Sequence, residues 1–154
     1  MVKIKNSTVP KIVDKTFGKT EVAVSQKKAF GYELLLDLYE VKEGVCDNLD
    51  LCYDFLDKLA IYIKVNKQSP PSIFRTDGEL YPDKAGLSGW VPLVESSIVI
   101  HTLSPKRFIT VDVYSCRRFD IDKVKEFVNR YFEPEKVEAQ FLERGLKYFE
   151  IEAQ

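Results

Sequence analysis

The sequence contains few of the residues that build metal centres and disulfide frameworks. His101 is the only histidine, and the three cysteines, Cys46, Cys52 and Cys116, form no CxxC pair. One histidine cannot build a multi-histidine metal site, and an odd number of cysteines favours free thiols in a reducing compartment. We therefore predict no bound metal, structural roles for Cys46 and Cys52, and a separate role for Cys116.

Long apolar runs and an excess of one charge are also missing. No apolar run approaches the roughly 18 residues that a bilayer-spanning helix needs, and the first residues lack the apolar core of a signal peptide. The 23 Lys and Arg residues almost balance the 24 Asp and Glu residues, so no global field attracts nucleic acid or a membrane surface. These absences predict a cytoplasmic protein that binds neither nucleic acid nor membrane.

The length and composition fit one folded domain with an arm in front of it. The 154 residues are 45% hydrophobic, which is ordinary for a single globular domain. Residues 1–29 hold seven lysines and show no sustained apolar period, a pattern typical of a solvated arm. We predict an N-terminal extension over residues 1–29, with one short strand around residues 21–24, and a folded domain over residues 30–154.

Apolar runs inside the domain predict its strands. The run 31–39 is compact and rich in Leu and Tyr, which favours a buried strand. Short polar breaks separate three further runs and predict an antiparallel meander over 87–94, 98–103 and 108–114. Residues 75–86 contain Asp, Gly and Pro and are expected to form a loop. Two final strands are expected over residues 137–141 and 147–151.

Two segments carry the apolar spacing of three and four that indicates a helix. Asp47 or Asn48 can cap the first helix and Asp120 the second, because their side chains accept hydrogen bonds from free backbone amides. The inward residues are expected to be, in the first helix, Leu49, Cys52, Leu56, Leu59 and Ile63 and, in the second, Ile121, Val124, Val128 and Tyr131.

This order of elements predicts an α+β domain. We expect a two-layer sandwich of antiparallel sheet with helices on one face, built from two similar halves. Alternation along the strand near residue 110 places Phe108, Tyr114 and Cys116 on the more polar face. Helices on one face leave this opposite face uncovered, so we expect it to meet a partner subunit, a ligand or both.

The stretch from Leu87 to Cys116 carries a specific motif. Its landmarks are Ser88-Gly89, Glu95-Ser96, Ile100-His101-Thr102 and Asp112-Val113-Tyr114-Ser115-Cys116. In type and spacing they match the short prokaryotic S-adenosylmethionine decarboxylases, a self-processing family with a pyruvoyl group. The run 31–39 also resembles the first strand of that family, so the similarity covers roughly residues 30–150.

The resemblance implies a function for four residues. In this family the bond corresponding to Glu95–Ser96 is cleaved by the protein itself, and Ser96 is then converted to the pyruvoyl group that forms a Schiff base with the amino group of the substrate. His101 would serve proton transfer during processing, Ser88 would orient the ester or the substrate, and Cys116 would return a proton to the product. The resemblance also implies a small amino-acid-type substrate, a homodimer of processed chains and a place in polyamine (spermidine) biosynthesis.

The sequence departs from the family pattern directly after the pyruvoyl serine and in the region that holds the nucleoside of the substrate. Ser97 replaces a histidine, and Leu103 and Pro105 replace a tryptophan and a glutamate. Candidate replacements that bind the substrate are Leu103, Phe108, Tyr114 and Tyr81. Three functions follow from this: decarboxylation of S-adenosylmethionine, the same chemistry on arginine or ornithine, and a chain that is not processed and acts as a binding or regulatory subunit.

Overall fold

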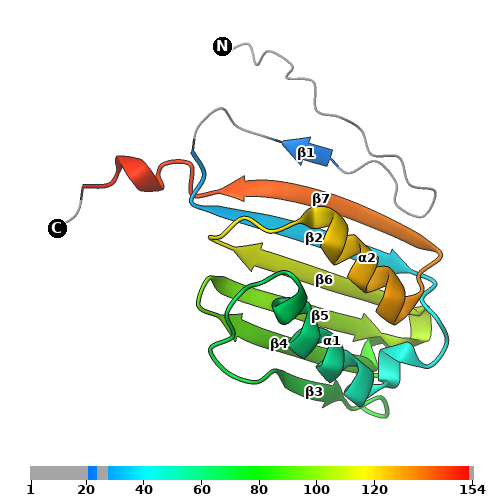
Figure 1. Ribbon diagram of the computed structural model, residues 1–154. Coiled ribbons are helices and arrows are strands. Elements are labelled where there is room, and N and C mark those ends of the chain that lie inside the picture. The colour runs from blue at the N-terminus through cyan, green and yellow to red at the C-terminus, as the bar shows by residue number, and fades with distance from the viewer. Residues whose placement is uncertain (1–20, 24–27, 153–154) are drawn as a thin grey trace.

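The structure is a computed structural model that describes residues 21–23 and 28–152, and one sheet organises it (Figure 1). The strands are β1 (Glu21–Ala23), β2 (Gly31–Tyr39), β3 (Ser72–Thr76), β4 (Gly86–Leu93), β5 (Ser96–Leu103), β6 (Phe108–Ser115) and β7 (Lys136–Arg144). The helices are α1 (Leu49–Tyr62) and α2 (Ile121–Phe132). Short 3₁₀ turns are η1 (Val45–Asp47), η2 (Pro82–Lys84), η3 (Ser104–Lys106) and η4 (Tyr148–Glu150).

The seven strands lie in the order β1-β7-β2-β6-β5-β4-β3. All neighbours are antiparallel except β1, which runs parallel to β7 at one edge of the sheet. The predicted short strand near residue 21 and the predicted meander are confirmed. The predicted loop over 75–86 is wrong at both ends, because Arg75 and Thr76 pair with Leu87 and Gly86 in the ladder between β3 and β4.

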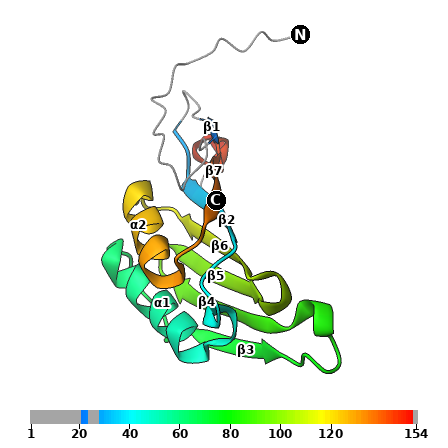
Figure 2. The same ribbon diagram turned by 90° about the vertical axis from the view of Figure 1, so that its right-hand side faces the viewer.

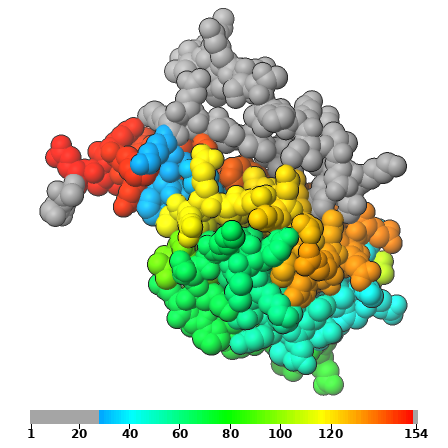
Figure 3. Space-filling model, viewed as in Figure 1, coloured from blue at the N-terminus to red at the C-terminus, as the bar shows by residue number. Residues whose placement is uncertain are grey.

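Both helices cover the same face of the sheet, as the edge view in Figure 2 shows. In the space-filling view their side chains lie over the strands (Figure 3). The α+β prediction is thereby confirmed, with each half of the chain contributing one helix to the covered face. No helix of the described segments is long and apolar enough to cross a membrane.

Each helix begins at a residue with a capping side chain. Asn48 accepts a hydrogen bond from the amide of Leu51, and Asp120 accepts from the amides of Asp122 and Lys123. The predicted inward stripes are largely right, but Leu49 is 39% exposed. In α2 the aromatic residues Phe127 and Phe132 are buried as well and pack against Phe55 of α1.

The predicted strand over residues 147–151 is wrong. Gly145 adopts a φ of +66°, a left-handed conformation that turns the chain away from β7. Residues Tyr148–Glu150 then form the 3₁₀ turn η4, and the ring of Tyr148 packs on Phe30 with 4.2 Å between the centroids. A local aromatic contact therefore replaces the expected ladder.

The other face of the sheet carries the mixed side chains that the sequence predicts. In β6 the residues Ile109, Val111, Val113 and Ser115 are buried toward the helices, whereas Phe108 and Tyr114 lie half-buried on the opposite side. We call this uncovered surface the open face. It also carries Ser88 and His101, because His101 pairs with Thr110 of β6 and Ser88 pairs with His101, and paired residues point to the same face of a sheet.

Candidate active site

Two of the four predicted catalytic residues meet on the open face. Ser88 of β4 and His101 of β5 are directly opposite each other in the ladder. Ser88 Oγ lies 2.8 Å from His101 Nδ1, within hydrogen-bonding distance. A hydroxyl and an imidazole at this distance can exchange a proton.

A mostly apolar hollow of about 400 Å³ adjoins this pair. Its walls include Phe74 of β3, Trp90 of β4 and Val99 of β5. The exposed fractions of Phe74 and Trp90 are 66% and 46%, which is high for large aromatic side chains. The hollow can therefore accept a flat or apolar part of a ligand.

The third predicted residue, Ser96, occupies a strained position. Strand β4 ends at Leu93 and β5 begins at Ser96, so Val94 and Glu95 form a two-residue turn between them. Ser96 has a φ of +149°, a conformation that residues other than glycine rarely adopt. Such strain persists only where surrounding contacts fix the backbone.

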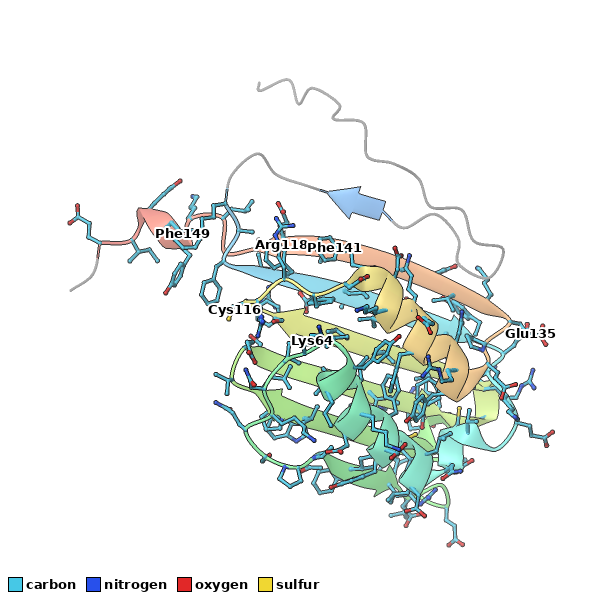
Figure 4. All side chains as sticks on the ribbon, viewed as in Figure 1. Lys64, Cys116, Arg118, Glu135, Phe141 and Phe149 are labelled. Carbon is cyan, nitrogen blue, oxygen red and sulfur yellow. The ribbon has the colours of Figure 1, made fainter. Side chains whose placement is uncertain are left out.

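The carbonyl that precedes Ser96 is held by the fourth predicted residue. The backbone N–H of Cys116 donates to the carbonyl oxygen of Glu95 at 2.9 Å. A backbone donor in this position stabilises negative charge that develops on the oxygen when the carbonyl carbon is attacked. The thiol of Cys116 is exposed at the end of β6 (Figure 4).

The side chain of Glu95 is also fixed. Glu95 as a residue is 9% exposed, and its carboxylate accepts from the backbone N–H of Asn66 at 2.9 Å and from Asn66 Nδ2 at 2.8 Å. Burial works to raise the pKa of Glu95, but the hydrogen bonds from Asn66, together with its own backbone N–H and the charge of Arg117, lower the pKa below that of an ordinary glutamate. Glu95 therefore stays ionised beside the Ser96 peptide bond.

Within one chain the pair Ser88–His101 lies far from the turn that contains Glu95 and Ser96. Ser96 and His101 are five residues apart on the extended strand β5, a separation of roughly 16 Å at the usual rise per residue. Direct proton transfer needs contact through a hydrogen bond or one water. One chain thus brings together Ser88 with His101, and Glu95 and Ser96 with Cys116, but it does not join the two groups.

The four predicted substrate-binding residues are also divided. Leu103 and Phe108 pair with each other near the end of the sheet that carries His101. Tyr81, which is 58% exposed, precedes η2. Tyr114 pairs with Ser97 at the opposite end, under the guanidinium of Arg144 at 4.4 Å from its ring centroid. These residues do not form one pocket within a single chain.

The motif does not reveal three further residues at the site. Asn66 carries no sequence signal, because a single asparagine after a helix usually belongs to a turn. Phe74 and Trp90 read as ordinary strand aromatics, and only their exposure beside His101 distinguishes them. Exposure of large aromatic side chains is a property of the folded surface.

The fold and the Glu-Ser turn define an α+β protein with a strained, hydrogen-bonded peptide bond at one end of its sheet. The sequence profile of the S-adenosylmethionine decarboxylase family matches residues 32–145. The chain belongs to this family.

Individual relatives agree with that assignment. The chain is 29% identical over 120 residues to the S-adenosylmethionine decarboxylase proenzyme of Persephonella marina, covering 77% of this chain and 85% of that protein. It is 27% identical over 119 residues to the proenzyme of Clostridium botulinum (strain Langeland), covering 77% and 97%. The crystal structure of the adenosylmethionine decarboxylase from Aquifex aeolicus superposes with a TM-score of 0.65 at 27% identity, covering 82% and 97%.

Proposed function

We propose that this chain is a proenzyme that cleaves itself between Glu95 and Ser96 and then decarboxylates S-adenosylmethionine. The observation that carries the proposal is the geometry of the turn, where the Glu95 carbonyl accepts the N–H of Cys116 next to the strained Ser96. Membership of the family and the names of the relatives support the same chemistry and substrate. Supply of decarboxylated substrate for spermidine synthesis and a cytoplasmic location are part of this proposal.

Processing begins with the hydroxyl of Ser96. Its Oγ attacks the carbonyl carbon of Glu95 while the N–H of Cys116 stabilises the oxygen. The C–N bond then breaks, the amine of Ser96 takes the proton, and an ester remains. A base removes the Cα proton of Ser96, and the main-chain carboxylate of Glu95 leaves from the ester as the new C-terminus of the first fragment. The resulting dehydroalanine takes up water, releases ammonia and becomes the pyruvoyl group. We assign the base to His101, oriented by Ser88.

The residues at the turn fit the pyruvoyl group that this sequence of steps leaves on residue 96. Such a group supplies an electron sink for the loss of carbon dioxide from an amino acid. The exposed thiol of Cys116, whose backbone lies next to the cleaved bond, returns a proton to the product carbon. Arg117, which follows it, adds positive charge beside Glu95 and favours an anionic carboxylate there.

A second copy of the chain completes the site in this proposal. Because Ser96 and His101 of one chain are roughly 16 Å apart, proton transfer between them requires His101 from a partner chain. The open face provides the surface for a symmetric dimer, since it is uncovered by helices and exposes Phe74 and Trp90. The apolar hollow beside His101 then belongs to the shared site and receives the adenosyl part of the substrate. Trp90 and Phe74 supply the aromatic surface that is lost where this chain has Leu103 and the family has a tryptophan.

Mass spectrometry of the purified chain tests the processing step. We expect two fragments, residues 1–95 and 96–154, the second with a blocked N-terminus, and no cleavage in the Ser96→Ala variant. A single species of 17.8 kDa after prolonged incubation would contradict the proposal and favour a binding or regulatory subunit.

Carbon dioxide release tests the substrate. The cleaved protein is assayed in parallel with S-adenosylmethionine, arginine, ornithine and lysine. We expect turnover of S-adenosylmethionine only, because a hollow with apolar aromatic walls suits an adenosyl group better than a short basic side chain. Turnover of arginine or ornithine alone would overturn the substrate assignment and leave the pyruvoyl chemistry in place.

A further inference from the structure

Asn66 and Glu95 lie 29 positions apart in the chain and are joined by two hydrogen bonds. Both carboxylate oxygens of Glu95 accept from Asn66, one from its backbone N–H and one from its side-chain amide. The carbonyl of Asn66 in turn accepts from the N–H of Val94 at 2.8 Å. One residue thus holds both members of the turn that precedes Ser96.

The segment that carries Asn66 is itself anchored. Lys67 forms an isolated antiparallel bridge with Leu93 and an ion pair with Asp57 of α1. The N–H of Gln68 donates to the carbonyl of Pro92 at 2.9 Å. The side-chain amide of Asn66 therefore reaches Glu95 from a support that is tied to both α1 and β4.

We propose that Asn66 is a positioning residue for self-cleavage of the Glu95–Ser96 bond. The inference rests on the proposed function and adds a residue to it. With the Glu95 side chain held by Asn66 and its carbonyl held by Cys116, the peptide plane before Ser96 is fixed from two sides, which keeps Ser96 in its strained conformation. The hydroxyl of Ser96 then stays near the carbonyl carbon of Glu95, and the strain is released when the C–N bond breaks.

The first test measures the rate at which the uncleaved chain disappears. Asn66→Ala removes only the side-chain hydrogen bond and keeps both backbone bonds, so we expect processing to slow by roughly tenfold to a hundredfold, the usual effect of one hydrogen bond to a charged group. Asn66→Asp places a second carboxylate against Glu95 and is expected to be slower still. Gln68→Ala is the matched control, because only the backbone of Gln68 bonds to β4, and it is expected to cleave at the wild-type rate.

A reciprocal exchange separates positioning from a general role in stability. In the double variant Asn66→Asp with Glu95→Gln the donor and the acceptor exchange places, and we expect it to cleave at least tenfold faster than Asn66→Asp alone. Thermal unfolding of each Asn66 variant in a Ser96→Ala background, where cleavage cannot occur, is expected to stay within a few degrees of that background.

The outcomes distinguish this inference from the proposed function. Wild-type cleavage together with an Asn66→Ala rate equal to wild type overturns the positioning role alone. A slow Asn66→Asp variant that Glu95→Gln does not rescue also overturns it, because loss of the contact is then not the cause. A wild-type chain that never cleaves overturns the proposed function and this inference with it.

Discussion

The three cysteines differ in environment, and this difference fixes their reactivity. Cys46 and Cys52 are buried, and their Sγ atoms contact the carbonyls of Phe108 at 3.8 Å and Val45 at 3.7 Å. Burial raises the thiol pKa to about 11 for Cys46 and about 12 for Cys52. Cys116 is exposed. Burial thus keeps the thiols of Cys46 and Cys52 protonated and shielded from solvent, whereas a reagent in solution can reach the thiol of Cys116.

Alkylation of the native chain checks this division. Treatment with iodoacetamide at pH 8 is expected to add one label per chain, at Cys116, because the other two thiols are inaccessible and remain protonated at that pH. The same treatment in denaturant is expected to add three. Peptide mapping by mass spectrometry locates the labels, and native labelling of Cys46 or Cys52 as fast as Cys116 would contradict the assignment.

At the scale of elements, a few local contacts fix how α1 lies on the sheet. Its N-terminus is capped by Asn48, and its apolar face passes over Gly89 of β4. A Cβ at residue 89 would lie 2.8 Å from Ile73 and 3.0 Å from Leu56, so the glycine allows the helix to approach the strand. The serine beside it, Ser88, consequently faces the opposite side and reaches His101.

Removal of the α1 cap is expected to lower stability without affecting the site. Asn48→Ala deletes the acceptor for the Leu51 amide and should reduce the free energy of unfolding by about 1 kcal/mol. Asn48→Asp keeps an acceptor in place and should remain near the wild-type value. Urea denaturation in a Ser96→Ala background, which keeps the chain whole, measures both, and equal midpoints for the Ala and Asp variants would show that the cap contributes nothing.

The division of the chain into an extension over residues 1–29 and a domain over 30–154 stays a prediction. The strand pairing of β1 with β7 joins residues 21–23 to the edge of the sheet, whereas the family profile begins at residue 32. The buried core begins at Ala29, the last residue of the predicted extension, and β2 and the later elements build the rest of it.

At the scale of the whole molecule, the separation of Ser96 from His101 leads to a test of the dimer. Mixing Ser96→Ala chains with His101→Ala chains during refolding creates mixed dimers in which one site combines an intact Ser96 with an intact His101. We expect cleavage of the His101→Ala chain in the mixture and no cleavage of either variant alone. Intact mass identifies which chain is cut, and cleavage of His101→Ala by itself would show that the histidine is not required.

In the proposed dimer, burial of the carboxylates of the open face would make association dependent on pH. Partial burial and neighbouring acids raise the pKa of Asp112, and burial together with Glu138 raises that of Asp37. A raised pKa means that the neutral form is favoured in this surface, and further burial against a copy favours it more. Association is therefore weakest above the raised values and tightens as the pH falls through them.

Sedimentation at several pH values measures this effect. We expect the dissociation constant of the dimer to decrease as the pH is lowered from 8 toward 4, and the Asp112→Asn variant to associate more tightly at pH 8 with a smaller dependence on pH. Thr110→Val, a change on the same strand and face that removes no charge, is the control. A dissociation constant that does not change with pH in the wild-type chain would argue against an interface on the open face.

The sequence by itself determined the parts of this protein that depend on local pattern. The boundaries of β2, the meander, both capped helices and the spacing of Ser88, Ser96, His101 and Cys116 follow from alternation, helical period and motif, because these are set by residues close together in the chain. The strand expected over residues 147–151 failed, since a short apolar run fits a strand or a turn equally well until a partner is present.

Only the tertiary structure decided which distant residues meet. It brought Asn66 to Glu95 and the N–H of Cys116 to the Glu95 carbonyl, and it exposed Trp90 beside His101. Such contacts depend on strand register and on how the segment after α1 returns to β4, both of which arise from packing of the whole sheet. No local period in a sequence records them.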